Sequence, residues 1–265
     1  MKKSILVFLG LVLINFSASA FIQKAYQQGE ELTFKLYYNS AMTGNVTAGK
    51  VVSKVKAVES NSNGQKQHHI VLKGETKGAF RWFFKVDDQY ETYINTNNQL
   101  PSYFKKRIKE GSYEASRDVK FDQDSGKIES LNNKNQDLRH YKTELKVQDL
   151  LSSLYYIRSF DFENIQLNQR FEINLFMDDS VYQIQFEFIG YEVAKTSLGS
   201  IKCMKFAPHV LTGGVFADET PMIIYVSNDK NHLPVLAVSE LMVGRATMEL
   251  VSHKGLKHPF VTVVE

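Results

Sequence analysis

Apolar and polar residues alternate along most of this chain, and that alternation restricts the possible folds more than any other feature. It is clearest at 31–38 (ELTFKLYY), 81–94 (RWFFKVDDQYETYI) and 182–193 (YQIQFEFIGYEV). A period of two places successive side chains on opposite faces of a β-strand, and the β-branched and aromatic residues in these runs favour strands. About a dozen such runs predict an all-β fold, either an antiparallel barrel or a strongly curved sheet.

Turn signals separate these runs, as expected for a meander of strands. Asn63-Gly64 suits a tight hairpin with positive φ. Two later turns end in Leu100-Pro101 and Leu233-Pro234, and each has a strand, a polar loop and a return strand that opens with Leu-Pro. Proline is tolerated at the first position of a strand, so both stretches are predicted to be hairpins.

The two Leu-Pro turns also bear on domain organisation. They lie in two stretches, about 28–145 and 165–255, that one predicted helix separates. Residues 21–265 are therefore predicted to form a single β domain, which is long enough to bury a full core. Its two halves are either similar β units or unrelated units that share one type of turn.

The first twenty residues have the three parts of a secretory signal peptide. Lys2 and Lys3 are positively charged, an apolar run covers 5–14, and 18–20 (Ala-Ser-Ala) provide small residues before a cleavage site. The apolar run is shorter than the roughly 20 residues that a membrane-spanning helix needs. We predict cleavage after Ala20, no transmembrane span thereafter, and export to the periplasm or to the periplasmic face of the outer membrane.

One stretch, 147–160 (VQDLLSSLYYIRSF), departs from the alternation and predicts an amphipathic helix. Its apolar residues recur at spacings of three and four, namely Val147, Leu150, Leu151, Leu154 and Ile157. A large sheet must close on itself or cover its apolar face. We therefore expect this helix to cap or fill the barrel.

Arg158 projects from the apolar side of this predicted helix, four residues after Leu154. Its side chain can reach solvent, where the charge would complement the helix C-terminus. Alternatively it forms an internal ion pair, because an unpaired buried charge is very costly. Glu240, in the strand-like run at 237–244 (AVSELMVG), is then the candidate partner.

Phe80, Trp82 and Phe84 alternate within a predicted strand and would therefore share one face of it. Such aromatic side chains either pack in the core or line an apolar pocket. A curved sheet with a helix over its mouth can hold an apolar ligand. In that case Leu154 and Tyr155 of the helix would complete the ligand-binding pocket.

The sequence lacks the motifs of common catalytic and metal sites, such as H-E-x-x-H, G-x-S-x-G and paired C-x-x-C. Its one cysteine, Cys203, lies in an alternating run and is expected to be a buried apolar residue. Without Lys2 and Lys3 the chain has 30 basic and 29 acidic residues, a net charge of +1 that disfavours nucleic acid as a partner. We predict no enzymatic activity, no catalytic residues, no metal and no cofactor.

Four motifs occur in an order that resembles one bacterial family. They are VDDQYETYIN…LPSYFKKRIKEGSYEASRDVKFD (86–122), QDLLSSLYYIRSF (148–160), TSLGSIKCMKF (196–206) and YVSNDKNHLPVLAVSELMVGRATMELV (225–251). Together they resemble the exported family known as domain of unknown function 3108, over about residues 28–255. The resemblance implies a secreted, mostly β protein with a fold similar to that of YmcC-like exported proteins, and it implies no established activity. The Leu-Pro hairpin also resembles one in periplasmic lipoprotein carriers, which hold acyl chains inside an open barrel.

These observations predict a non-catalytic exported protein of the cell envelope that binds an apolar or amphiphilic ligand, such as a lipid or a lipid-linked glycan. The alternative is a structural or adaptor protein that binds another envelope protein. A large apolar cavity under the helix would favour the first function, and a filled core with an exposed apolar patch would favour the second. Histidines and carboxylates that converge in a cleft would indicate an enzyme.

Overall fold

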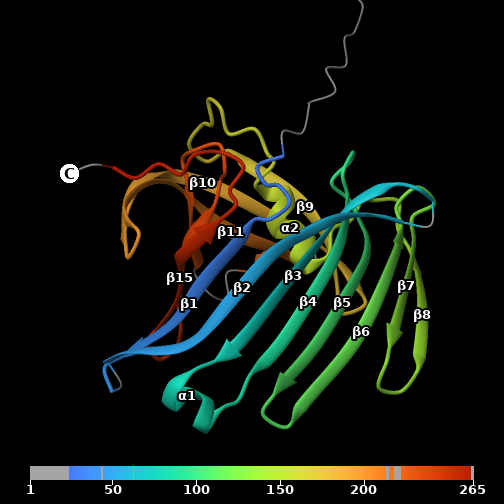
Figure 1. Ribbon diagram of the computed structural model, residues 1–265, viewed down its shortest axis with the longest axis horizontal. Helices are drawn as coiled ribbons and strands as arrows, with labels where there is room; N and C mark the ends of the chain where they lie inside the picture. Colours follow the sequence, from blue (N-terminus) through green and yellow to red (C-terminus); the bar gives the residue numbers. More distant parts are fainter. Residues whose placement is uncertain (1–23, 43, 62, 213–214, 218–221, 264–265) are drawn as a thin grey trace, which may run out of the picture.

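The computed structural model describes residues 24–42, 44–61, 63–212, 215–217 and 222–263 (Figure 1). The predicted signal peptide and its cleavage site lie outside the described residues. Strands cover most of the described chain, and short turns connect them. In the described part of the chain, no helix is long and apolar enough to cross a membrane.

The described residues form fifteen strands and two short helices. Before the second helix the elements are β1 (Glu31–Ser40), β2 (Gly44–Ser60), β3 (Lys66–Thr76), α1 (Gly78–Phe83), β4 (Asp87–Asn95), β5 (Pro101–Glu110), β6 (Tyr113–Asp122), β7 (Lys127–Asn132) and β8 (Asp137–Lys142). After α2 (Leu150–Ile157) they are β9 (Arg170–Met177), β10 (Ser180–Thr196), β11 (Gly199–Thr212), β12 (Val215–Ala217), β13 (Met222–Ser227), β14 (Pro234–Glu240) and β15 (Arg245–Lys254).

All these strands belong to one antiparallel sheet. Its order is β8-β7-β6-β5-β4-β3-β2-β1-β15-β14-β13-β11-β10-β9, with β12 paired to β11 beside this path. Because β1 pairs with both β2 and β15, the first and last strands of the chain join the two halves of the sheet. The prediction of an antiparallel barrel or strongly curved sheet is confirmed. A true repeat between the halves stays a prediction.

The sheet rolls up until β9, at one edge, lies against the inner face of the first half (Figure 1). Phe176 of β9 packs against Phe121 and Tyr141, with ring centroids 6.1 Å and 5.3 Å apart. At the tip of the β9–β10 hairpin, the Asp179 carboxylate pairs with the Arg117 guanidinium of β6. Aromatic packing and ion pairs therefore close the barrel along this seam.

The concave side of the sheet is packed with side chains from both halves. In the first half, Leu151 and Tyr155 of α2 join a buried cluster that includes Ile70 and Phe104 of the sheet. A second cluster, which includes Phe206, fills the concave side of the second half. The space between α2 and the sheet is thus filled by packed side chains.

The cap of α2 anchors the helix to the sheet. The Asp149 carboxylate accepts hydrogen bonds from the backbone N–H groups of Leu151 and Ser152, and the Ser152 hydroxyl accepts one from the Asp149 N–H. This reciprocal pattern is a capping box. The Thr92 hydroxyl of β4 donates a further bond of 2.6 Å to the same carboxylate. This fully buried carboxylate therefore joins the start of α2 to the sheet.

The residues that α2 buries differ from the apolar set predicted from the sequence. Leu151 and Tyr155 are buried, whereas Leu154 is 46% exposed and Leu150 lies at the surface. The helix is also shorter than the predicted 147–160. Because the cap is tied to β4, the rotation of the helix follows from that hydrogen bond as well as from hydrophobicity.

Arg158 forms a buried ion pair, as one of the two interpretations of the sequence required, but the predicted partner is wrong. Its two terminal nitrogens donate to the two carboxylate oxygens of Glu30 at 2.6 Å and 2.8 Å. The Arg158 and Glu30 side chains are 4% and 0% exposed. Glu240 instead pairs at the surface with Arg245, which faces it across the β14–β15 hairpin.

The other contacts of Arg158 join three separate parts of the chain. Its Nε donates to the carbonyl of Asn231 in the β13–β14 turn, and its Nη2 donates to the carbonyl of Ala25 before β1. The guanidinium also lies over the rings of Tyr26 and Tyr155, 5.7 Å and 5.1 Å from their centroids. The helix end is therefore fastened to both halves of the sheet.

We predict that Arg158→Met lowers the free energy of unfolding by about 3–5 kcal/mol, because it leaves the Glu30 carboxylate buried and unpaired. The double variant with Glu30→Leu should recover at least half of this loss. Arg245→Met, which breaks an exposed pair, should cost less than about 1 kcal/mol. Urea unfolding curves measure all three values, and a double variant as unstable as the sum of the single variants would contradict the internal pair.

A second prediction concerns pH. Burial raises the pKa of Asp149 to about 6, although its hydrogen bonds oppose the shift. The folded state therefore binds a proton that the unfolded state has released, so this group's contribution to stability is present below about pH 4 and is lost as the pH rises through about 6. Asp149→Asn keeps an oxygen for the cap and removes the titration. Relative to the parent protein, the variant should gain about 2–3 kcal/mol of unfolding free energy between pH 4 and pH 7. Parallel stability profiles for the two proteins would contradict this assignment.

Candidate functional site at one end of the barrel

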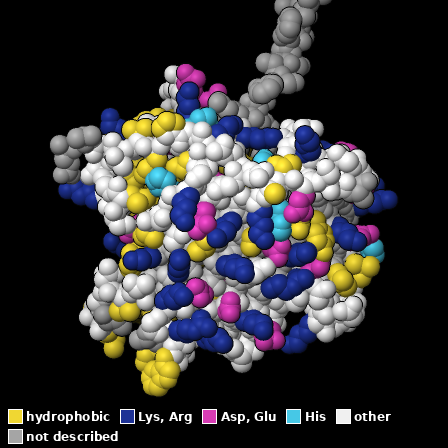
Figure 2. Space-filling view, viewed as in Figure 1, with side chains coloured by type: hydrophobic (Ala, Val, Ile, Leu, Met, Phe, Trp, Pro, Cys, Tyr) yellow, Lys and Arg dark blue, Asp and Glu magenta, His cyan; other side chains and the backbone are white. Residues whose placement is uncertain are grey.

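Large apolar side chains are exposed at the end of the barrel where the β1–β2 turn, the β14–β15 turn and α1 meet. We call this surface the apolar end and define it by six residues: Met42, Trp82, Phe83, Phe84, Met242 and Val243. Met42, Trp82 and Phe83 are 92%, 84% and 76% exposed. Figure 2 shows hydrophobic side chains that project beyond the polar surface at this end, over the position of α1.

The helix α1 places three of these side chains. The chain leaves the sheet at Thr76 and returns to it at Asp87, and Gly78 begins the helix with a φ of +55° that favours glycine. The N–H of Phe84 donates to the carbonyl of Phe80 at 2.8 Å and ends the helix. Phe80 turns back toward the sheet, where its ring lies 6.4 Å from that of Tyr38. The other aromatic residues of α1 are therefore left at the surface.

The two neighbouring hairpin turns are held together by specific bonds. The Tyr38 hydroxyl of β1 donates to the carbonyl of Val243 at 2.7 Å. Gly244 has a φ of +84°, and a Cβ at this position would collide with the carbonyl of Asn39. Glycine therefore allows the β14–β15 turn to lie directly against β1. This contact holds Met242 and Val243 beside the β1–β2 turn.

Two ion pairs lie near the apolar end. The Lys77 ammonium lies 2.7 Å from Glu75, and the Arg245 guanidinium lies 2.6 Å from Glu240. Both pairs are partly exposed, so each contributes little to stability. Arg81, in α1, and Lys85, directly after Phe84, add positive charge at the same end.

The ligand pocket predicted from the sequence is not assembled. Phe80, Trp82 and Phe84 lie on or directly after α1 rather than on one strand face, because the β3–β4 connection closes into a helical turn. Both helix residues of the predicted pocket lie on α2: Tyr155 is buried and its hydroxyl is hydrogen bonded to Ser53 at 2.7 Å, whereas Leu154 is 46% exposed. The predicted pocket is therefore wrong, although Trp82 and Phe84 belong to the apolar end.

Sequence reasoning missed the other members of the apolar end. Leu241, Met242 and Val243 are three consecutive apolar residues directly before Gly244, at a position where hairpin turns are usually polar. Met42 lies in the same kind of place, shortly before Gly44. Apolar residues in turns were thus an available signal, and they indicate a surface that is covered in function.

Burial shifts the pKa values of two reactive side chains inside the protein. Burial lowers the pKa of His68 to about 4 and raises the pKa of the Cys203 thiol to about 12. At neutral pH the histidine is therefore uncharged and the thiol protonated. Among the described residues, no group of three or more His, Cys, Asp or Glu side chains is placed to hold a metal ion.

Comparison with known proteins supports the family and the fold. The family model described as "Protein of unknown function (DUF3108)" matches residues 33–251. A β-barrel-like protein of Brucella abortus, from a family called DUF1849, aligns with a TM-score of 0.57 at 10% identity, over 87% of this chain and 99% of that one. At this identity the likeness concerns the fold alone.

Two further solved structures align less well. One is a candidate exported protein of Bacteroides fragilis with a YmcC-like fold, with a TM-score of 0.35 at 12% identity over 86% of this chain and 97% of that one. The other is a candidate lipoprotein of Parabacteroides distasonis, with a TM-score of 0.37 at 11% identity over 86% of this chain and 96% of that one. No curated protein matches the sequence.

Proposed function

The chain belongs to the DUF3108 family of unknown function, and we propose that it is a non-catalytic, exported protein of the cell envelope that attaches to lipid through the apolar end. The observation that carries this proposal is the exposure of six large apolar side chains on three adjoining segments. Soluble monomers rarely expose contiguous apolar patches of this kind unless another surface covers them.

The shape of the apolar end favours a lipid bilayer as the covering surface. Its side chains project from one short helix and two hairpin tips, so each can enter the headgroup region separately. Trp82 is the only tryptophan in the chain, and tryptophan prefers the interface between lipid and water. Lys77 directly precedes α1 and Arg245 begins β15 directly after Gly244, so cationic side chains adjoin these apolar residues in the chain.

The free energy expected from inserting these side chains into lipid is small enough for attachment to be reversible. Full burial of one Met, Phe or Val side chain contributes about 1.5–3 kcal/mol, so insertion of three such side chains would contribute about 5–9 kcal/mol before ordering costs. An interior lipid site is less well supported, because packed side chains fill the space beneath α2. We therefore propose that the protein contacts lipid at the membrane surface, through the apolar end, and does not hold it in the interior.

The second candidate is an adaptor that binds another envelope protein. The filled interior and the exposed apolar patch are the combination that we expected from the sequence for this function, so both observations favour it. Here the partner would cover Trp82 and Phe83 with a complementary apolar surface. The two functions differ in whether lipid alone is sufficient for binding.

The single tryptophan allows a direct test. On addition of vesicles of phosphatidylethanolamine with a minor fraction of phosphatidylglycerol, the fluorescence of Trp82 should shift to the blue, and brominated lipids should quench it. Phe83→Ser should weaken co-sedimentation with these vesicles at least tenfold, which corresponds to about 1.4 kcal/mol.

Leu167→Ser is the matched control. Leu167 is also exposed, but it lies on the loop that follows α2, far from α1 in Figure 1. This variant should bind vesicles like the parent protein. Unchanged Trp82 fluorescence and no co-sedimentation would show lipid attachment to be wrong and would leave the adaptor function, which photo-crosslinking from position 83 in envelopes would test.

A further inference from the structure

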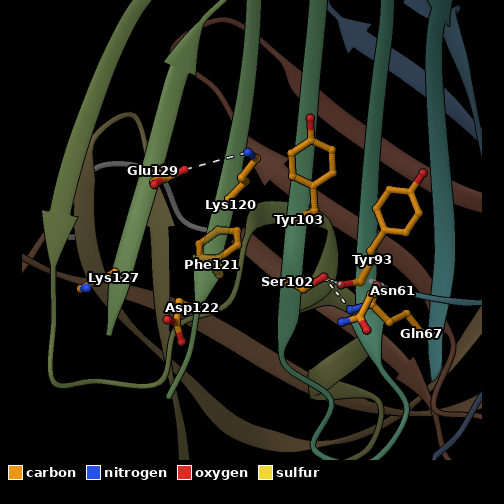
Figure 3. Close-up of a pocket in the computed structure, with 10 residues that line it drawn as sticks. All are labelled: Asn61, Gln67, Tyr93, Ser102, Tyr103, Lys120, Phe121, Asp122, Lys127 and Glu129. Carbon is orange, nitrogen blue, oxygen red and sulfur yellow. Dashed lines mark hydrogen bonds and ion pairs between the residues drawn. The ribbon is translucent and has the colours of Figure 1, made fainter. Parts of the chain in front are cut away.

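A groove of about 520 Å³ lies on the outer face of the sheet, at the opposite end of the strands from α1 (Figure 3). β4 shows the geometry: it starts beside α1 at Asp87 and ends beside the groove at Asn95. Thr92 points inward to the cap of α2, so its neighbour Tyr93 points outward. The groove has the size of a small-molecule site, about 300–1,000 Å³.

Two tyrosine rings form the floor and wall of this groove. Tyr93 of β4 and Tyr103 of β5 are directly opposite each other in the sheet, with ring centroids 6.0 Å apart. Figure 3 shows the two rings side by side on neighbouring strands. Both side chains are only half-buried, so part of each ring is available to a ligand.

Neighbouring side chains hold the rings in place. His69 stacks on Tyr93, with centroids 4.3 Å apart and planes 8° from parallel. The Tyr103 hydroxyl donates to the Asp118 carboxylate at 2.6 Å, and Arg107 and Asn133 donate to the same carboxylate. Burial and this hydrogen bond raise the pKa of Tyr103, which stays protonated. The aromatic surface is therefore rigid before any ligand arrives, which lowers the entropic cost of binding.

Apart from Phe121, whose side chain also packs in the core, the rest of the lining is polar and has no excess charge. Lys120 and Lys127 are balanced by Asp122 and Glu129. The Lys120 ammonium and the Glu129 carboxylate are 4.0 Å apart and 71% and 46% exposed, so both are free to turn toward a ligand. The amide of Gln67 lies at the edge of the same groove. The groove thus offers both hydrogen-bond donors and acceptors.

We propose that this groove binds an oligosaccharide without excess charge. A sugar ring has one face of C–H groups, which suits the exposed surface of Tyr93 or Tyr103, and a rim of hydroxyls, which both donate and accept hydrogen bonds. A phosphate-rich ligand would require an excess of positive charge. An acyl chain could cover the aromatic rings, but it would offer no hydrogen-bond partners to the seven polar or charged residues among the ten that line the groove.

The position of the groove makes it independent of the apolar end. The two surfaces lie at opposite ends of β4, so a molecule attached through α1 would direct the groove away from the membrane. Variants at one surface leave the other intact. Saccharide binding and lipid attachment can therefore succeed or fail separately.

Titration calorimetry and saturation-transfer NMR with cellotriose, maltotriose and chitotriose test the proposal. At least one of these probes should bind at millimolar concentration or below. Tyr103→Ala and Tyr93→Ala should each weaken binding tenfold or more, whereas Tyr103→Phe, which keeps the ring, should retain most of it. Tyr113→Ala removes an exposed tyrosine near α1 and should have no effect.

A second pair of variants guards against loss of folding. Lys120→Ala and Glu129→Gln change exposed side chains and should weaken binding about threefold to tenfold without a change in thermal stability. The proposal is overturned if none of the three probes binds. It is equally overturned if binding survives the loss of both Tyr93 and Tyr103, or if Tyr113→Ala weakens it as much as they do.

Discussion

The buried pair between Arg158 and Glu30 is the interaction on which the rest of this structure depends. The two residues are far apart in the sequence, and both side chains are almost completely buried. Charges in this environment are tolerated only with near-complete pairing, and here every terminal nitrogen of Arg158 has an oxygen partner. The pair therefore requires that the helix, the chain before β1 and the β13–β14 turn come together in one arrangement.

That arrangement explains how a long sheet becomes a closed body. A sheet whose edge strands are far apart in space can splay open, and strand pairing alone does not prevent this. In this protein α2 lies on the concave side and packs against the first half, while Arg158 at its end reaches Asn231 in the second half. The seam between Phe176 and Phe121 completes the closure. Packed side chains therefore fill the interior, and the surfaces that we propose for binding lie on the outside of the barrel.

The two outer surfaces to which we assign the proposed functions differ in chemistry. The apolar end exposes Trp82, Phe83 and Met242 on connections between strands, which vary without disturbing the sheet. The groove at the other end is built on the strands themselves, so Tyr93 and Tyr103 are held at a fixed spacing. An attachment surface can be built from exposed side chains on connections, whereas a site for a shaped ligand benefits from the rigid sheet.

Local patterns in the sequence were sufficient for the fold class, the hairpin turns and the approximate position of α2. Alternation with a period of two and Leu-Pro turns reflect contacts between near neighbours, which the residues themselves specify. They could not show that residues 78–83 form a helix, because six residues (GAFRWF) are too few to distinguish a helical turn from a strand.

The tertiary structure alone decided which distant groups meet. The sequence suggested Glu240 as the partner of Arg158, and only the roll of the sheet brings Glu30 to the helix and leaves Glu240 at the surface. The same roll gathers Met42, Trp82 and Met242 at one end. Contacts between such distant residues depend on the twist and curvature summed over many strands, which cannot be predicted from a short stretch of sequence.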